Sequence, residues 1–166
     1  MRFSVLVDNN LNDKACSCEH GLSLWLEVCN TCVLLDTGQS NLFANNASLM
    51  NIDITKADYA IISHGHYDHT GSFPAFYKIN EKAPIYIHKD AFRDSYGFRE
   101  GKPEDEKSGI IWTDEERAAL ADRLKFTEGP VYITENICIT GTVPYAEGTN
   151  ITENFYYKDD DGEWQK

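Results

Sequence analysis

The sequence predicts an α/β (α+β) fold in which helices flank a mixed sheet. Two short apolar runs at 22–28 and 32–36 predict an antiparallel hairpin. A continuous apolar run at 59–62 predicts a strand buried on both faces, and apolar residues at helical spacing over 72–79 predict a helix that packs against it. A chain of 166 residues is long enough to bury one such core.

The N-terminal part supplies the antiparallel strands and the first helix. Residues 1–7 predict a first strand, and Asn30-Thr31 predicts the turn of the hairpin that follows. Residues 41–50 predict a helix that is capped by Ser40 or Asn41, since short polar side chains accept hydrogen bonds from the first free backbone N–H groups.

The C-terminal part is less regular. Residues 93–110 are half charged and show no clear period, so we expect a long loop there. Thr113-Asp114-Glu115-Glu116 fits a capping box that opens a helix to about Leu124. An acidic, frayed tail is expected at the end of the chain. Further strands are expected at 84–88, 131–134, 137–140 and 155–158, the second and third as a hairpin around Glu135-Asn136.

Charge and hydropathy exclude several function classes. The formal net charge of −12 argues against a nucleic-acid surface, which needs clustered Lys and Arg, and it disfavours anionic membranes. No window approaches the roughly 20 apolar residues that a membrane helix needs. The apolar run Phe3–Val7 is too short for a signal-peptide core. We therefore expect a cytoplasmic protein with a small-molecule substrate and with neither nucleic acid nor membrane as a partner.

The five cysteines allow two interpretations. An odd number without a secretory context predicts free thiols. Cys16-x-Cys18 followed by Cys29-x-x-Cys32 also has the spacing of a structural zinc knuckle. The simpler alternative is that Cys29 and Cys32 pack as small hydrophobic residues where one strand turns into the next.

A cluster of metal-binding residue types follows the buried strand at 59–62. Three histidines and one aspartate, His64, His66, Asp68 and His69, fall within six positions. His64 and His66 can point toward one metal, while Asp68 and His69 face a neighbouring position. Two metals about 3.5–4 Å apart can share and activate one water molecule. We expect two divalent ions, zinc first, with iron or manganese as alternatives.

This motif resembles that of the metallo-β-lactamase superfamily, in which His-x-His-x-Asp-His follows a buried strand. Other phrases resemble one branch, the hydrolase-like proteins related to the archaeal dihydropterin ribofuranosylaminobenzene-phosphate synthase. The resemblance covers nearly the whole chain and implies an αββα sandwich, of which residues 1–166 would form the N-terminal half. The phrases are Asp8-Asn9-Asn10, Glu19-His20-Gly21-Leu22-Ser23, Leu34-Leu35-Asp36-Thr37-Gly38-Gln39-Ser40 and His88-Lys89-Asp90-Ala91-Phe92.

The resemblance also implies roles for individual residues. His64 and His66 would bind the first metal, and Asp68 and His69 the second. Asp68 would be the catalytic residue that orients the attacking water. Asp36 would hydrogen-bond the loop that carries the ligands, which places it behind them rather than on the metal.

The sequence does not decide the roles of two further histidines or the reason why the second half of the fold is missing. His20 and His88 are expected either to face a substrate pocket or to be ordinary structural histidines. The superfamily takes more ligands from a second half, and no histidine follows His88. The chain is a fragment of a longer protein, one subunit of a split enzyme, or a degenerate half-domain. A half sheet leaves an unpaired edge and an apolar face, so we expect self-association.

The leading functional prediction is a metal-dependent hydrolase that uses a metal-activated water on a small ester, lactone, amide or phosphoester. We expect the chain alone to be inactive, because catalytic zinc usually has three protein ligands. One alternative is a phosphodiesterase or nuclease of the same superfamily. The other is a non-catalytic metal-binding or interaction half-domain.

Overall fold

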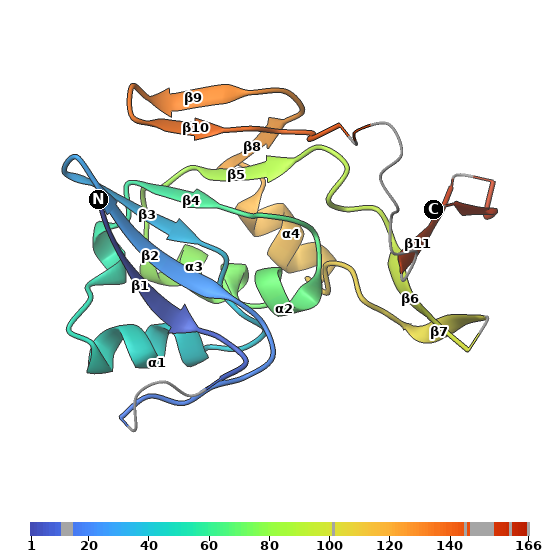
Figure 1. The fold of residues 1–166 in the computed structure, drawn as a ribbon, viewed down its shortest axis with the longest axis horizontal. Helices are drawn as coiled ribbons and strands as arrows, with labels where there is room; N and C mark the ends of the chain where they lie inside the picture. Colours follow the sequence, from blue (N-terminus) through green and yellow to red (C-terminus); the bar gives the residue numbers. More distant parts are fainter. Residues whose placement is uncertain (11–14, 101, 145, 147–154, 160, 166) are drawn as a thin grey trace.

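The main feature of the computed structural model is a six-stranded mixed sheet (Figure 1). The structure describes residues 1–10, 15–100, 102–144, 146, 155–159 and 161–165. The strand order is β1-β2-β3-β4-β5-β8. The first three strands are antiparallel, and β3, β4, β5 and β8 are parallel. The strands are β1 (Arg2–Val7), β2 (Ser23–Val28), β3 (Thr31–Leu35), β4 (Tyr59–Ile61), β5 (Ile85–His88) and β8 (Leu124–Thr127).

The predicted hairpin is confirmed, and its turn lies one residue earlier than expected. Val28 pairs with Thr31, so Cys29 and Asn30 form the two-residue turn. Their φ angles are 47° and 65°. Positive φ at both central positions matches the twist of the flanking strands, which is why such turns are favoured in short hairpins.

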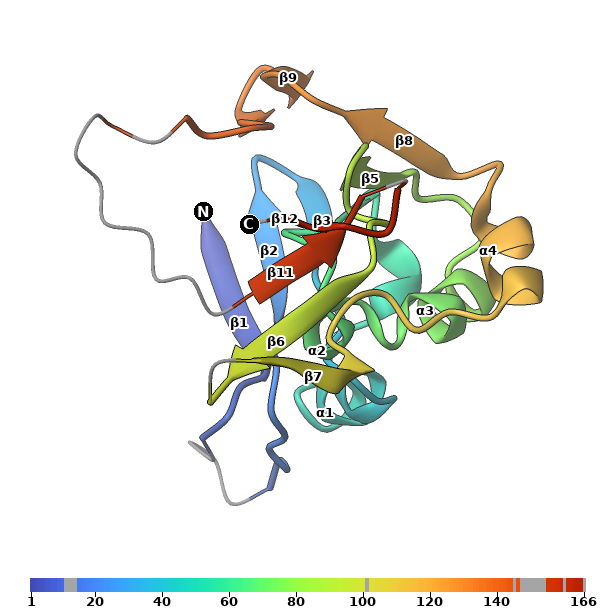
Figure 2. The same cartoon turned by 90° about the vertical axis from the view of Figure 1, so that its right-hand side faces the viewer.

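In the described part of the chain, four α-helices and one short 3-10 helix (Ile54–Lys56) accompany the sheet. In Figure 2 the four α-helices lie on one side of it. Asn41 is the N-cap residue of the first helix without a side-chain capping hydrogen bond, and the N–H of Leu42 donates to Oγ of Ser40 at 3.2 Å. No helix among the described residues is long and apolar enough to cross a membrane. The α-helices are α1 (Leu42–Leu49), α2 (Tyr67–Thr70), α3 (Phe73–Ile79) and α4 (Asp114–Leu120).

The helix expected to reach about Leu124 is shorter than predicted. The capping box is present: the Thr113 side chain accepts from the backbone of Glu116, and the Glu116 side chain accepts from the backbone of Thr113. The helix nevertheless ends at Leu120, and residues 124–127 form the sixth strand, β8. This strand pairs with β5 in parallel, and that long-range pairing decides the conformation of a four-residue segment with little local signal.

The core lies between the sheet and the helices. One residue from each of five neighbouring strands stands in register on this face and is buried. Phe43 of α1 and Phe73 and Phe76 of α3 cover the row and are themselves fully buried. The packing of the 59–62 segment against the 72–79 helix is therefore confirmed, but burial on both faces was wrong, because Tyr59 and Ile61 are only partly buried on the opposite face. The row is Trp25, Leu34, Ala60, Ile85 and Leu124.

The opposite face of the sheet is apolar and only partly covered. The hairpin of β9 (Val131–Thr134) and β10 (Ile137–Ile139), predicted from the sequence, lies over this face (Figure 2). Between hairpin and sheet is a groove of about 650 Å³ whose apolar lining includes Leu26, Leu35 and Ile61.

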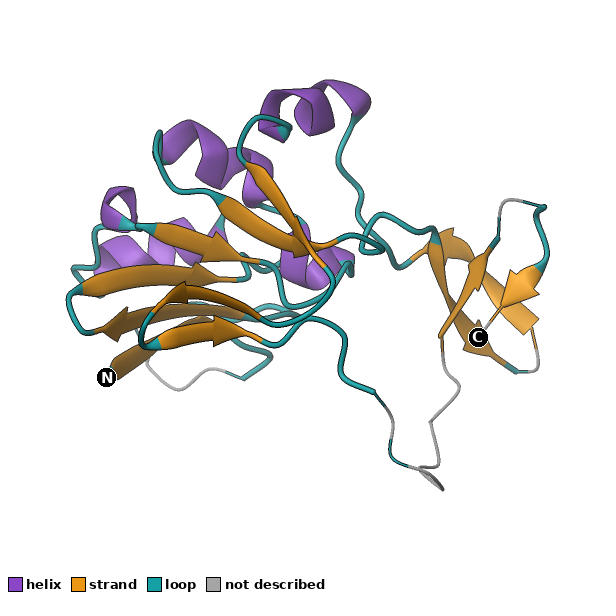
Figure 3. Cartoon of the chain, turned by 90° about the horizontal axis from the view of Figure 1, so that it is seen from above, coloured by secondary structure: helices purple, strands orange, loops and turns teal. Residues whose placement is uncertain are grey.

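The prediction of a long loop at 93–110 is wrong, because these residues contribute two strands to a second, small sheet. Those residues contain an antiparallel hairpin of β6 (Ser95–Arg99) and β7 (Lys102–Lys107). The predicted strand β11 (Phe155–Lys158) pairs with β6, and β12 (Trp164–Gln165) pairs with β11 where a frayed tail was expected. Figure 3 shows this sheet at one end of the molecule, apart from the six-stranded sheet.

Candidate metal centre

The predicted ligand motif lies at the carboxyl ends of two neighbouring parallel strands. Residues 64–69 follow β4 and run into α2, and Asp36 directly follows β3. The N–H of Asp36 donates to the carbonyl oxygen of Ile61 at 2.9 Å, which continues the pairing of the two strands. Asp36 has a φ of 57°, a left-handed conformation that Asp tolerates better than most residues. The parallel pairing thus brings Asp36 beside the ligand loop.

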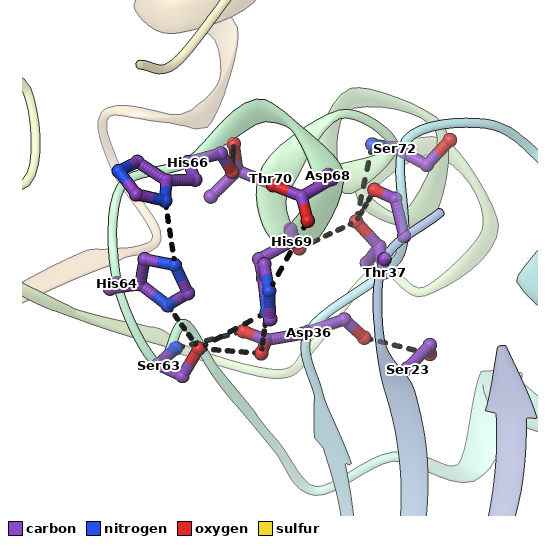
Figure 4. A network of polar contacts seen from close by, with 12 residues as sticks. Ser23, Asp36, Thr37, Ser63, His64, His66, Asp68, His69, Thr70 and Ser72 are labelled. Carbon is purple, nitrogen blue, oxygen red and sulfur yellow. Dashed lines mark hydrogen bonds and ion pairs between the residues drawn. The ribbon is translucent and has the colours of Figure 1, made fainter. Parts of the chain in front are cut away.

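Asp36 is fully buried and accepts hydrogen bonds from two residues of that loop (Figure 4). Its Oδ1 accepts from the backbone N–H of Ser63 at 2.8 Å. Its Oδ2 accepts from the Ser63 hydroxyl at 2.6 Å and lies 2.8 Å from Nδ1 of His69. A buried carboxylate with three such partners fixes the position of both residues.

These contacts set the protonation pattern of two imidazole rings. A carboxylate only accepts, so Nδ1 of His69 carries a proton toward Asp36. The Ser63 hydroxyl donates to Asp36 and lies 3.0 Å from Nδ1 of His64, so it accepts from that nitrogen. In the neutral rings of His64 and His69 the lone pair is therefore on Nε2, the form that binds metals.

The four motif residues form two donor pairs. Nε2 of His64 lies 3.1 Å from Nδ1 of His66, and Nε2 of His69 lies 3.5 Å from Oδ2 of Asp68. Two donors of one tetrahedral zinc, each about 2.0–2.1 Å from the ion, are about 3.3 Å apart. The spacing of each pair therefore fits two ligands of one ion.

Neither pair is a complete metal site. Among the residues that the structure describes, no group of three or more His, Cys, Asp or Glu is arranged to hold a metal ion. This finding also corrects the zinc-knuckle interpretation, because Cys16, Cys18, Cys29 and Cys32 are all described and all free. Cys29 occupies the hairpin turn and Cys32 pairs with Glu27 across the hairpin, so strand geometry places both.

The environment of the three motif histidines shifts their pKa values in different directions. Burial, followed by the charge of His64, lowers the pKa of His66 to about 4. Burial also lowers the pKa of His64. Burial alone would lower the pKa of His69, but the hydrogen bond and charge of Asp36, with the charge of Asp68, raise it overall. At neutral pH the first pair is therefore neutral, as metal binding requires.

The two remaining predicted site residues differ in their surroundings. His20 lies beside the motif, with its Nε2 3.3 Å from Oδ2 of Asp68. His88 lines the same apolar groove as His64. Both ring nitrogens of His88 have partners: Nδ1 accepts from the N–H of Asp90 at 3.1 Å, and Nε2 lies 2.8 Å from Oγ1 of Thr142.

Sequence reasoning missed two neighbours of the motif. Ser63 links His64 to Asp36, and its hydroxyl directly before the motif was the available signal. Phe155 of β11 places its ring 4.4 Å, centroid to centroid, from that of His66. No local pattern could have shown this second contact, because the two residues are far apart in the sequence.

Comparison with known proteins shows to which family the chain is related. The family model of the metallo-beta-lactamase superfamily matches residues 17–148. Uncharacterized protein MJ0448 of Methanocaldococcus jannaschii is 34% identical over 148 residues, which cover 86% of this chain and 53% of that protein. The 7,8-dihydropterin-6-methyl-4-(beta-D-ribofuranosyl)-aminobenzene-5'-phosphate synthase of the same organism is 30% identical over 142 residues, covering 80% and 47%. The chain thus spans about half the length of the curated relatives it matches.

A solved structure shows the same fold. MEM-A1, a subclass B3 metallo-beta-lactamase isolated from a soil metagenome library, superposes with a TM-score of 0.51 at 12% identity, covering 86% of this chain and 53% of that one. The mixed sheet with flanking helices is therefore shared with this class of structure. Taken with the match over residues 17–148, it follows that the chain belongs to the metallo-β-lactamase superfamily.

Proposed function

We propose that this chain carries the His-x-His-x-Asp-His part of the metal centre of a hydrolase that acts on a small ester, amide or phosphoester. The observation that supports this most is the orientation of the imidazole rings. In the neutral rings, the contacts of Asp36 and Ser63 with Nδ1 direct the lone pair of His64 and of His69 to Nε2, the atom that faces the other residue of its pair. Histidines that serve only packing have no need of such an arrangement.

In this proposal each pair has a defined role. His64 and His66 bind one ion, and Asp68 and His69 bind a second. The ions, zinc first and iron or manganese as alternatives, would supply an activated water and stabilise charge on the bond under attack. Asp68 orients the attacking water through its carboxylate, and Asp36 holds the ring of His69 in place.

The proposal also requires donors beyond these four. Catalytic zinc usually has three protein ligands, whereas each pair here provides two. Since the chain spans about half the length of its curated relatives, we propose that it forms the N-terminal part of a metallo-β-lactamase domain. A second half, or a second copy of the chain, would then complete the site.

Metal content tests the proposal directly. We expect the wild-type protein, loaded with zinc and desalted, to retain metal by elemental analysis, and the His64→Ala/His66→Ala variant to retain less. Tyr132→Ala, an exposed change on β9, serves as the control and should match the wild type. Retention of less than about a tenth of an equivalent of any transition metal by the wild type would contradict the proposal.

The absence of a three-ligand group among the described residues favours one alternative, a non-catalytic metal-binding half-domain. Turnover separates the two functions. A hydrolase, assembled with its missing donors, should cleave members of an ester and phosphoester panel, and this activity should disappear in His64→Ala/His66→Ala. Zinc binding with no turnover on the whole panel would instead support the half-domain.

A further inference from the structure

The carboxylate of Asp68 lies between two imidazole rings. Its Oδ2 is 3.3 Å from Nε2 of His20 and 3.5 Å from Nε2 of His69. When the His69 ring is neutral, its Nε2 carries a lone pair, because Nδ1 then holds the proton that faces Asp36. Two acceptors that face each other repel, so Oδ2 needs a donor or a cation nearby. Nε2 of His20 is the nearer of the two imidazole nitrogens and can donate to it.

We propose that His20 is a positioning residue that fixes the Asp68 carboxylate by donating a hydrogen bond from Nε2. Its side chain is 62% exposed and that of Asp68 is 11% exposed, so the contact lies at the mouth of the site. The inference rests on the proposed metal-binding role of Asp68. It assigns His20 to hold Asp68 in position, in the same way that Asp36 holds His69.

The segment that carries His20 is built around Asp68. Gly21 has a φ of 132°, and a Cβ there would lie 2.1 Å from the carbonyl oxygen of Asp68. The next residue, Leu22, donates its N–H to this same carbonyl at 3.3 Å. Gly21 also donates to Oδ1 of Asn9 at 2.8 Å. The backbone of Asp68 and that of residues 21–22 therefore pack directly against each other.

A second anchor lies on the other side of His20. Both carboxylate oxygens of Glu19 accept from Ser40, at 3.1 Å from its N–H and 2.6 Å from its hydroxyl. With Glu19 and Gly21 both held, the backbone of His20 has little freedom, and the imidazole stays within reach of Asp68. Removal of the ring would let the carboxylate turn toward solvent.

Zinc binding to the full chain tests this inference. We expect His20→Ala to weaken zinc affinity by about tenfold or more, the usual effect of losing a partner of a metal ligand. His20→Gln should recover most of that loss, because its side-chain amide can donate from a similar position. Competition with a chromophoric chelator measures the affinity, and the visible spectrum of the cobalt-loaded protein reports changes at the ligands. Tyr132→Ala is the control.

A metal-free measurement keeps the outcome separate from the proposed function. Nitrogen NMR of the imidazole rings should show the proton of His20 on Nε2, and Asp68→Asn should shift that signal. Wild-type zinc binding together with unchanged affinity in His20→Ala, or failure of His20→Gln to recover it, would overturn the inference alone. Absence of zinc binding by the wild type would overturn the proposed function and the role of His20 with it.

Discussion

At the scale of single residues, Asp36 is the group on which the geometry of the motif depends. It is fully buried and accepts from Ser63 twice and from His69 once. An Asn there presents an NH₂ group to at least one of these donors, so a hydrogen bond is replaced by a repulsive contact. Because the site is buried, water cannot replace the lost partner, and such a mismatch lowers the free energy of unfolding.

We therefore expect Asp36→Asn to weaken zinc affinity by about 10- to 100-fold and to lower the free energy of unfolding by about 1–3 kcal/mol. Chelator competition and urea unfolding measure the two effects. Asp58→Asn is a control, because Asp58 also accepts a backbone hydrogen bond, from Cys32 at 2.9 Å, but at the amino ends of β3 and β4, opposite to the end that carries the motif. Equal zinc affinity in Asp36→Asn and the wild type would contradict this account.

The lowered pKa of His66 predicts that the stability of the metal-free protein depends on pH. Its pKa in the folded state is about 4, below the usual 6.5, so unfolding raises its affinity for protons. The stability that it contributes is present above pH 6.5 and is lost as the pH falls toward 4. The raised pKa of His69 acts in the opposite sense, with stability present below pH 6.5 and lost as the pH rises.

Urea unfolding of wild type and His66→Gln, both in excess chelator, isolates this contribution. The stability difference between the two proteins should fall as the pH goes from 6.5 to 4. Other titrating groups are shared, so they cancel in the difference. A difference that stays constant across this window would show that the His66 pKa is not lowered.

The residue scale also shows what the sequence can reveal about the site. The four motif residues fall within six positions of the sequence, so their pattern alone predicted a cluster of metal-binding side chains: His64, His66, Asp68 and His69. Ser63 and Phe155 become neighbours of that cluster only through tertiary contacts. The proton positions on the rings likewise depend on Asp36, which is far away in the sequence.

At the scale of secondary-structure elements, the capping box of α4 is the clearest case of local sequence deciding structure. Thr113 accepts from the N–H of Glu116 at 3.2 Å, and Glu116 accepts from the N–H of Thr113 at 3.0 Å. Thr113→Ala should lower the free energy of unfolding by about 1 kcal/mol in a urea titration. Thr113→Ser keeps the hydroxyl and should lose much less, so equal losses in the two variants would contradict the capping role.

The end of α3 depends instead on a distant arginine. Arg123 is buried and donates to backbone carbonyls of the segment after α3, including that of Ala83 at 2.8 Å from Nε and 2.6 Å from Nη2. Nη2 also lies 3.1 Å from Oδ1 of Asn80, a buried side chain that itself accepts from the N–H of Ala83 at 2.8 Å. The planar fork of an Arg is suited to several acceptors at once.

Arg123→Lys keeps the charge and loses this fork, so it should lower the free energy of unfolding by about 1–3 kcal/mol. Urea unfolding of the metal-free protein is the measurement. Arg99→Lys, at an exposed ion pair with Glu104, is the control and should change stability by no more than about 0.5 kcal/mol. Similar losses in both variants would show that the carbonyl contacts contribute little.

Elements that the sequence did not predict share one property. The strands β6, β7 and β8 have weak local patterns: β6 contains a glycine, β7 reads Lys-Pro-Glu-Asp-Glu-Lys, and the alternation of β8, Leu-Lys-Phe-Thr, extends over only four residues. Pairing partners supply what the local sequence lacks: β11 for β6, β6 for β7, and β5 for β8. Strands with strong local patterns, such as the hairpin at 23–35 and β4, were predictable because burial on the sheet requires those patterns.

At the scale of the whole molecule, the apolar face away from the helices decides how the chain behaves in solution. Phe3 and Val5 of β1 are 60% and 37% exposed, and they point to the same face as the apolar groove. β1 is also the edge of the sheet, where backbone groups can pair with another strand. Exposed apolar surface beside a free edge favours association with a second sheet.

We expect the chain to self-associate at micromolar concentration, with a mass above that of a monomer in light scattering. Phe3→Lys/Val5→Lys should shift the mass toward the monomer, because charged side chains on an edge strand oppose pairing. Phe126, which is 58% exposed on the helix side, offers the control Phe126→Lys, which should leave the mass unchanged. A strictly monomeric wild type would contradict the prediction.

The position of the motif along the chain has a consequence for synthesis. Asp36, Ser63 and the four motif residues all precede β5, and the strands that hold them in register are β3 and β4. A nascent chain that has left the ribosome as far as β5 already contains Asp36 and Ser63, which contact the rings of His64 and His69, but it does not yet contain Phe155, which lies beside the ring of His66. The orientation of the rings of His64 and His69 can therefore be set during translation, whereas the ring of His66 gains its aromatic neighbour only after the C-terminal strands have been made.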